Sequence, residues 1–215
     1  MKALVFDLDG TLVDSTEFWD NIGKNYLISQ GVIPKEDLNE AIAHLRIGET
    51  AAYMVENYEL GKAYMQVKED LDQILFLFYK KQARLKPFAL DMIKLLKDKN
   101  VRVAIASVTD DEFIQAFLDK HDMSHYFEFI QTNGNTQLTK HDEDYFKLLT
   151  KRLDMEAKDI YLFEDSLYSM KTAKKAGLNV VAVEDDYSKK NIREIIEVAD
   201  IYIKNFGHII DLLQL

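Results

Sequence analysis

The chain has 215 residues, with 27 Lys and Arg against 37 Asp and Glu, so its formal net charge is −10 and its pI is near 5.0. An acidic surface repels polyanions, and we therefore expect neither nucleic acid nor a membrane surface as a partner. The absence of cysteine excludes disulfides, thiolate zinc sites and cysteine nucleophiles.

The hydrophobic content of 47% is enough to form a packed core. No apolar run approaches the roughly 18 residues that a membrane-spanning helix needs. The first strand-like run leads directly into an acidic segment at Asp7, unlike a secretory signal. We expect a cytoplasmic globular protein of one domain, or one domain with an insertion. Composition gives no oligomeric state.

Short apolar runs alternate with amphipathic helical patterns along most of the chain. The expected strands are Ala3–Phe6, Val101–Ala106, Phe127–Ile130, Ile160–Phe163, Val180–Val183 and the weaker Ile201–Ile203. The expected helices are Phe88–Lys99, Asp110–Lys120, Asp142–Leu153, Ser166–Ala176 and Lys190–Val198. Strands that are apolar on both faces are typical of a covered parallel sheet. The pattern predicts an α/β fold with helices flanking a parallel sheet.

One long segment, from about Ser15 to Arg84, has no strand-like run. Its apolar residues follow a helical spacing, as in Leu71, Ile74, Leu75, Phe78 and Tyr79. Pro87 marks the return to the α/β pattern. We predict a helical cap domain of residues 15–85, inserted into a core domain of residues 1–14 and 86–215.

Two carboxylates follow the first strand, at Asp7 and Asp9, and Gly10 then permits a sharp turn. In an open α/β sheet, ligands bind at the carboxyl ends of the strands. Residues two apart on an extended chain point the same way, so the two carboxylates would repel each other unless a proton or a cation intervenes. A plain Asp-Gly turn is the structural alternative.

Polar residues also follow two later strands. Ser107 and Val108 lead into a helix start, where a hydroxyl and free backbone amides can bind an anion, or where the loop simply caps the helix. Glu164 and Asp165 form another acidic pair, although Asp165 could serve only as a helix cap. Oxygen ligands of this kind suit Mg²⁺, which would make an acidic edge attractive to a phosphoryl group. Lys140, in a later loop, could complete the charge balance, although most lysines are solvated surface charges.

These motifs together resemble the haloacid dehalogenase-like hydrolase superfamily. The run from Asp7 to Leu12 resembles its first motif, Ser107 its second and Lys140 its third, and Glu164–Ser166 resembles its fourth. The helical insertion stands where the superfamily's first type of cap belongs. His141 and Glu143 occupy positions around Lys140 where family members often carry proline.

The resemblance implies a Rossmann-like core and a role for each matched residue. Asp7 would be the nucleophile that forms an aspartyl-phosphate, and Asp9 the general acid and base. Asp7, the main-chain carbonyl of Asp9 and Asp165 would hold Mg²⁺, with Glu164 in support. The phosphate oxygens would be bound by Ser107, the backbone near Val108 and Lys140.

The expected function is therefore Mg²⁺-dependent hydrolysis of a small phosphorylated metabolite. One alternative is a β-phosphoglucomutase-like phosphotransferase, although Trp19 and Asp20 stand where such enzymes usually carry a cap histidine. Another is an idle binding or regulatory protein of the same fold. Glu17, Trp19, Arg46 and Gly48 could contact a substrate, with packing or surface ion pairs as the structural alternative.

Overall fold

The computed structural model describes residues 2–42, 45–207 and 209. Within these residues the main sheet has six parallel strands in the order β5-β4-β1-β6-β7-β8. The strands are β1 (Ala3–Phe6), β4 (Arg102–Ser107), β5 (Ile130–Thr132), β6 (Ile160–Glu164), β7 (Asn179–Val183) and β8 (Ile201–Ile203). This arrangement confirms the predicted α/β fold.

The predicted bounds of β5 were wrong. The sequence placed this strand at Phe127–Ile130, whereas it starts at Ile130 and continues to Thr132. Phe127–Phe129 form the approach to the strand, in which Glu128 N–H donates to Val103 O at 2.8 Å. The apolar run thus lies mostly in the segment before the strand. β5 is at the edge of the sheet, and its paired residues Gln131 and Thr132 are polar, so an apolar run does not mark its position.

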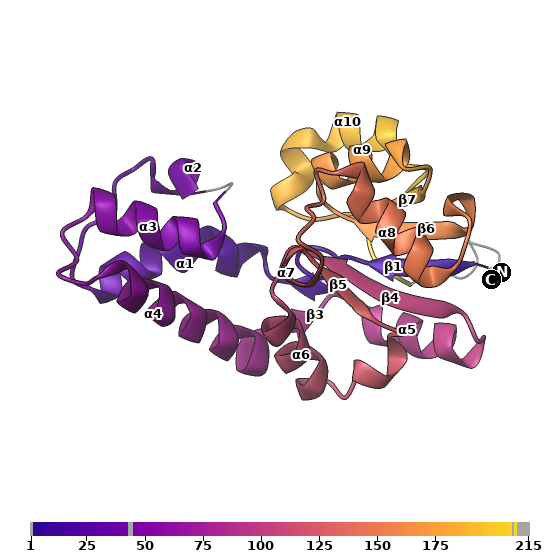
Figure 1. Ribbon diagram of the computed structural model, residues 1–215, viewed down its shortest axis with the longest axis horizontal. Helices are drawn as coiled ribbons and strands as arrows, with labels where there is room; N and C mark the ends of the chain where they lie inside the picture. The colour runs from indigo at the N-terminus through magenta and orange to yellow at the C-terminus, as the bar shows by residue number, and fades with distance from the viewer. Residues whose placement is uncertain (1, 43–44, 208, 210–215) are drawn as a thin grey trace.

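Helices cover both faces of the sheet. The helices of the core are α5 (Ala89–Asp98), α6 (Asp111–Lys120), α7 (Asn133–Thr136), α8 (Glu143–Leu153), α9 (Leu167–Lys175) and α10 (Ile192–Val198). Short 3₁₀ turns are η2 (Ser124–Tyr126), η3 (Ala157–Asp159) and η4 (Tyr187–Asn191). In Figure 1, α8, α9 and α10 lie on one side of the sheet, and α5 and α6 on the other.

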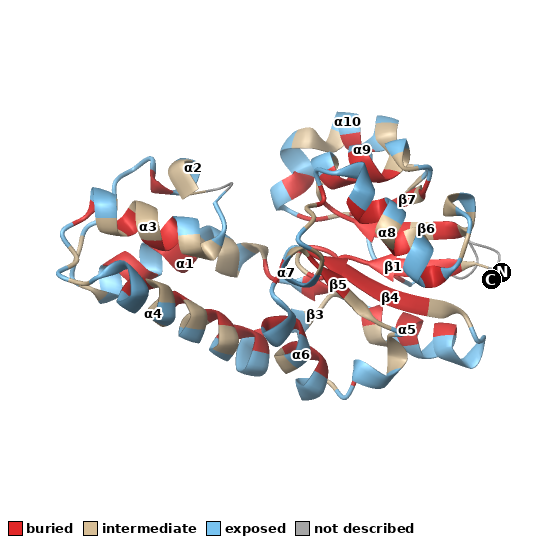
Figure 2. Ribbon diagram, viewed as in Figure 1, coloured by how far each residue is buried: buried red, intermediate tan, exposed pale blue. Residues whose placement is uncertain are grey.

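Alternate residues of each strand supply the two apolar layers. Leu4 and Phe6 of β1 pack with α5 and α6, whereas Ala3 and Val5 pack with α8 and α9. This alternation follows from the two-residue period of a strand. Figure 2 shows the strands buried and the outward faces of the helices exposed.

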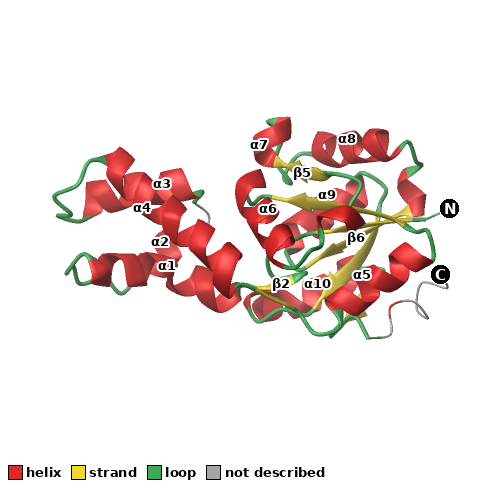
Figure 3. Ribbon diagram, turned by 90° about the horizontal axis from the view of Figure 1, so that it is seen from below, coloured by secondary structure: helices red, strands yellow, loops and turns green. Residues whose placement is uncertain are grey.

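The insertion forms a helical unit beside the sheet, at the carboxyl ends of its strands (Figures 1 and 3). Its elements are α1 (Thr16–Ser29), α2 (Leu38–Ile42), α3 (Ile47–Asn57), α4 (Tyr64–Leu77) and the π-helical turn η1 (Phe78–Gln82). The chain leaves the core through β2 (Val13–Asp14) and returns through β3 (Arg84–Leu85), and these two strands pair antiparallel. The sequence pattern missed both, because two-residue strands have no periodicity. The division into a core of 1–14 and 86–215 and a cap of 15–85 stays a prediction, which this separation supports.

The described helices include none that is both long enough and apolar enough to span a membrane.

Candidate active site

Asp7 lies directly after β1, with its backbone N–H bonded to Phe163 O of β6 at 2.9 Å. Its side chain is buried, and Oδ1 lies 2.9 Å from the Lys140 ammonium. Among the described residues, none donates a hydrogen bond of normal geometry to this oxygen. Burial raises the pKa of Asp7 to about 7, helped by the negative charge of Glu164 and opposed by Lys140. The nucleophile candidate therefore has one buried oxygen paired with a cation.

Glu164, at the end of β6, anchors Lys140. The Lys140 ammonium lies 2.8 Å from Glu164 Oε2, and both side chains are buried. Glu164 also accepts hydrogen bonds from the Ser169 hydroxyl at 2.7 Å and from the backbone amides of Asp165 and Ser166 at 3.1 Å. Burial alone would raise the pKa of Glu164, but Lys140 and these donors bring it below its ordinary value. Glu164 is thus ionised and holds the lysine in place.

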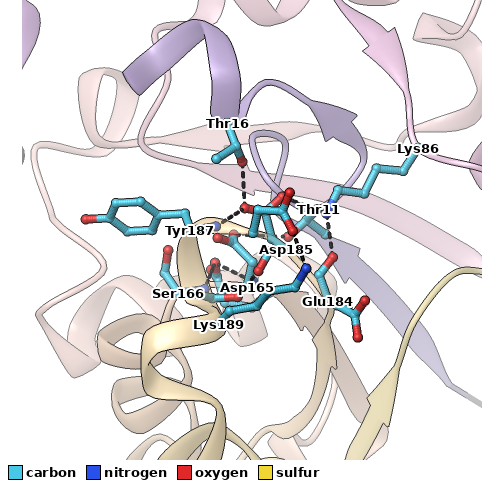
Figure 4. Close-up of polar contacts among 12 residues, drawn as sticks. Thr11, Thr16, Lys86, Asp165, Ser166, Glu184, Asp185, Tyr187 and Lys189 are labelled. Carbon is cyan, nitrogen blue, oxygen red and sulfur yellow. Dashed lines mark hydrogen bonds and ion pairs between the residues drawn. The ribbon is translucent and has the colours of Figure 1, made fainter. Parts of the chain in front are cut away.

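Asp165 lies against the turn that follows Asp7. The Thr11 hydroxyl donates to Asp165 Oδ1 at 3.4 Å, as Figure 4 shows among the contacts of this region. Gly10 has φ +72°, and a Cβ built on it would lie 2.7 Å from Asp165 Cγ. Glycine is therefore required here both for the backbone conformation and for the space. Burial, then Glu164, Asp7 and Asp185, raise the pKa of Asp165 well above its ordinary value.

These carboxylates fit a divalent cation. Among the described residues, Asp7, Glu164 and Asp165 bring ligand oxygens within 4.8 Å of one another. Carboxylate oxygens are the ligands that Mg²⁺ prefers. Glu164 is already engaged by Lys140, Ser169 and two backbone amides, and direct ligation by Asp7 and Asp165 with Glu164 in support stays a prediction. Asp9 is not in this group, and the expected contribution of its main-chain carbonyl stays a prediction.

The side chain of Asp9 has partners of its own. The Tyr79 hydroxyl lies 2.8 Å from Oδ1 and 2.7 Å from Oδ2, and the Thr109 hydroxyl donates to Oδ2 at 2.5 Å. Asp9 is still close enough to Asp7 to raise the pKa of Asp7 slightly. Burial, and then the charge of Asp9, raise the pKa of Tyr79 well above its ordinary value, so the phenol keeps its proton.

Ser107 and Val108 occupy the same sheet edge, at the end of the strand beside β1. Ser107 is fully buried, and its Oγ accepts a hydrogen bond from Thr109 N–H at 3.3 Å. The Tyr145 hydroxyl donates to Ser107 O at 3.3 Å, which fixes the end of the strand. The Val108 side chain is exposed. Phosphate binding by Ser107, Val108 and Lys140 stays a prediction, although Ser107 ends β4, the strand that pairs with β1 just before Asp7.

Sequence reasoning missed three polar residues near this edge. The sequence pattern places Tyr79 only on an apolar helix face, and it assigns Thr109 no part in the site. Asp185 follows β7 and contacts the Thr16 hydroxyl at 2.5 Å and the Lys86 ammonium at 2.9 Å (Figure 4). The rule applied to the earlier strands, that polar residues at a strand end point to the site, would have selected Asp185 as well.

Comparisons with known proteins agree with this geometry. The family model of the haloacid dehalogenase-like hydrolases matches residues 4–183. A phosphorylated carbohydrates phosphatase of Thermotoga maritima is 23% identical over 178 residues, covering 83% of this chain and 82% of that protein. Phosphoglycolate phosphatase 1 of Pseudomonas aeruginosa is 26% identical over 198 residues, covering 87% and 71%.

The fold also has solved counterparts. The crystal structure of CbbY from Rhodobacter sphaeroides in complex with phosphate superposes with a TM-score of 0.75, covering 97% of this chain and 96% of that one at 21% identity. The matched family model spans both the acidic strand ends and the helical insertion. The chain therefore belongs to the haloacid dehalogenase-like hydrolases, as its motifs predicted.

Proposed function

We propose that this protein is a Mg²⁺-dependent phosphatase that hydrolyses a small phosphorylated metabolite through an aspartyl-phosphate on Asp7. The observation that carries the proposal is the buried set of Asp7, Lys140, Glu164 and Asp165. It joins the Asp7 carboxylate to a lysine that Glu164 holds in place, and it adds a second buried carboxylate, that of Asp165. Its phosphatase relatives of Thermotoga maritima and Pseudomonas aeruginosa support the same class of reaction.

The chain's own residues divide the reaction into two displacements. An oxygen of Asp7 attacks phosphorus while the bond to the leaving oxygen breaks, and Asp9 gives its proton to that oxygen. A water molecule then attacks the aspartyl-phosphate, Asp9 takes the water proton, and the bond between phosphorus and Asp7 breaks. Lys140 and Ser107 bind the non-bridging oxygens, assisted by the backbone at Val108.

Asp7 and Asp165 are the residues that would hold Mg²⁺, with Glu164 in support. When bound, the cation supplies positive charge that offsets these carboxylates and favours a phosphoryl group beside them. Burial raises the pKa values of Asp7 and Asp165, and a bound cation would favour the ionised form of both groups.

The helical insertion stands at the open end of the strands, where a substrate would enter (Figure 1). We propose that it acts as a cap that restricts access of water to the phosphoryl group. Its loops, rather than the core, would select the metabolite. Sugar phosphates and phosphoglycolate are the first compounds to test, given the names of the relatives.

The proposal is tested by phosphate release. Purified protein with Mg²⁺ is incubated with a panel of phosphorylated metabolites, and free phosphate is measured. We expect the Asp7→Asn variant to lose activity, whereas Asp98→Asn, an exposed carboxylate on α5, should keep it. Intact mass measurement after a rapid quench should detect a phosphorylated wild-type chain. Unchanged turnover in Asp7→Asn would contradict the assignment of the nucleophile.

Product analysis separates the alternatives. A hexose phosphate that is isomerised instead of hydrolysed would identify a phosphotransferase. Absence of any product across the panel would favour a binding protein of the same fold. Mg²⁺ should also raise the thermal unfolding temperature of the wild type, and this shift should be lost in Asp165→Asn.

A further inference from the structure

Tyr79 connects the helical insertion to the proposed acid and base. It lies in η1, the last helical turn before the chain returns to the core, and its side chain is fully buried. Its hydroxyl is within 2.8 Å of both oxygens of Asp9. Among the described residues, the second hydroxyl on this carboxylate comes from Thr109, in the loop after β4. Asp9 is therefore held from two sides, by one residue of the core and one of the insertion.

The ring of Tyr79 is fixed by aromatic packing. It stacks on Phe113 of α6, with ring centroids 6.0 Å apart and planes 12° from parallel. Its neighbour Phe78 meets it edge-on at 5.1 Å and stacks on Phe18 of α1 at 3.7 Å. The hydroxyl position thus depends on α1 and η1 of the insertion as well as on α6 of the core.

The local backbone is unusual at this point. Ala83 N–H bonds to Phe78 O at 2.8 Å, the five-residue step of a π-helix. Single π turns are rare and occur frequently at functional sites. Here the turn places two adjacent aromatic residues in the interior, with Tyr79 aimed at Asp9.

We propose that Tyr79 is a positioning residue that sets the orientation of the Asp9 carboxylate and so links the placement of the insertion to proton transfer. The inference rests on the proposed phosphatase function. In the first displacement, the proton moves from Asp9 to the leaving oxygen as the bond to phosphorus breaks, and Tyr79 keeps its own proton throughout. Movement of the insertion would move the hydroxyl and change the direction in which Asp9 presents its proton.

The test uses the Tyr79→Phe variant, which removes one oxygen and keeps the ring. Two aryl esters of similar shape are compared, phenyl phosphate and 4-nitrophenyl phosphate. 4-Nitrophenolate is a good leaving group and departs without a proton, whereas the departure of phenolate depends more on protonation. A misplaced acid should therefore slow the hydrolysis of phenyl phosphate more than that of 4-nitrophenyl phosphate. We expect kcat/KM to fall about tenfold for phenyl phosphate and less than about twofold for 4-nitrophenyl phosphate. The ratio of the two values is independent of how much of the variant is folded.

Tyr26→Phe is the matched control. Tyr26 is a second buried tyrosine of the insertion, and its hydroxyl donates to the carboxylate of Asp70 at 2.9 Å instead of to Asp9. In Tyr26→Phe, we expect the ratio of the kcat/KM values for the two esters to equal the wild-type ratio. Equal losses on both esters in Tyr79→Phe, or no loss on either, would overturn the positioning role. Failure of the wild type to release phosphate from both esters and from every compound of the metabolite panel would instead refute the proposed function.

Discussion

Lys86 and Asp185 form an ion pair of 2.9 Å between the segment that returns from the insertion and the end of β7. Their side chains are only 10% and 4% exposed. Lys86 also donates to Glu184 O at 2.7 Å, and Asp185 accepts from the Thr16 hydroxyl at the start of α1 (Figure 4). Both connections of the insertion therefore meet one carboxylate at the sheet edge.

Removing one partner of the pair between Lys86 and Asp185 should lower the stability of the protein. Asp185→Ala leaves the Lys86 ammonium buried with only a carbonyl oxygen, and we expect the free energy of unfolding to fall by about 3 kcal/mol. Urea denaturation measures the change. The double variant Lys86→Met/Asp185→Ala should lose clearly less than the sum of its single variants, because it leaves no unpaired charge. Asp144→Ala, which breaks the exposed pair with Lys147, is the control and should change little. Additive losses in the double variant would show that the pair does not interact.

Gly10→Ala should disturb the metal site. The new Cβ would lie 2.7 Å from Asp165 Cγ, so the carboxylate must move. We expect weaker Mg²⁺ binding and lower phosphatase activity, together with a loss of about 1 kcal/mol in stability from the left-handed backbone. Titration calorimetry with Mg²⁺ measures the first effect. Gly61→Ala is the control, since Gly61 has φ +62° and nothing within 4 Å of its Cβ position among the described residues. Equal Mg²⁺ affinity in the two variants would contradict the role of Asp165.

The pair of Arg102 and Glu128 should give a pH-dependent stability. Two hydrogen bonds of 2.7 Å join them at the start of β4, and hydrogen bonding by Arg102 holds the pKa of Glu128 below its ordinary value of 4.5. The stabilisation is complete above that value and is lost as the pH falls through the lower folded pKa. We expect Glu128→Gln to lower the free energy of unfolding by no more than about 1 kcal/mol at neutral pH, because the pair is partly exposed. Denaturation at a series of pH values should show this difference shrinking in acid. If the difference in free energy of unfolding between the variant and the wild type stayed constant in acid, it would not arise from the charge of Glu128.

Asp122→Gly should stabilise the protein. Asp122 follows α6 with φ +52°, in a helix ending where Met123 N–H bonds to Leu118 O and Asp122 N–H to Asp119 O. Glycine is favoured at this left-handed position, and the Asp122 side chain is fully exposed. Relief of the left-handed backbone should outweigh the entropy that glycine adds to the unfolded chain, so we expect a gain of about 0.5 to 1 kcal/mol, visible as a higher thermal unfolding temperature. Asp98→Asn, an exposed change with no backbone strain, should leave it unchanged. A lower unfolding temperature in Asp122→Gly would mean that the side chain contributes more than its exposure indicates.

Much of the site followed from the order of residues at strand ends. Asp7, Ser107 and Glu164–Asp165 each come directly after an apolar run, and parallel strands bring such positions to one edge. Lys140 was harder to predict, because its sequence neighbourhood resembles a surface loop. Only the packing of that loop against Asp7 and Glu164 buries its ammonium and pairs it with two carboxylates.

The sequence by itself determined the alternating α/β core, the helical character of the insertion and the acidic strand ends, because each depends on local periodicity or on neighbours along the chain. The tertiary structure alone decided that Tyr79 reaches Asp9 and that Asp185 joins both connections of the insertion, since these partners are 70 and about 100 or more residues apart. No local pattern encodes such contacts. They exist because the insertion packs against the carboxyl ends of the strands and brings distant polar groups into a buried space where each must find a partner.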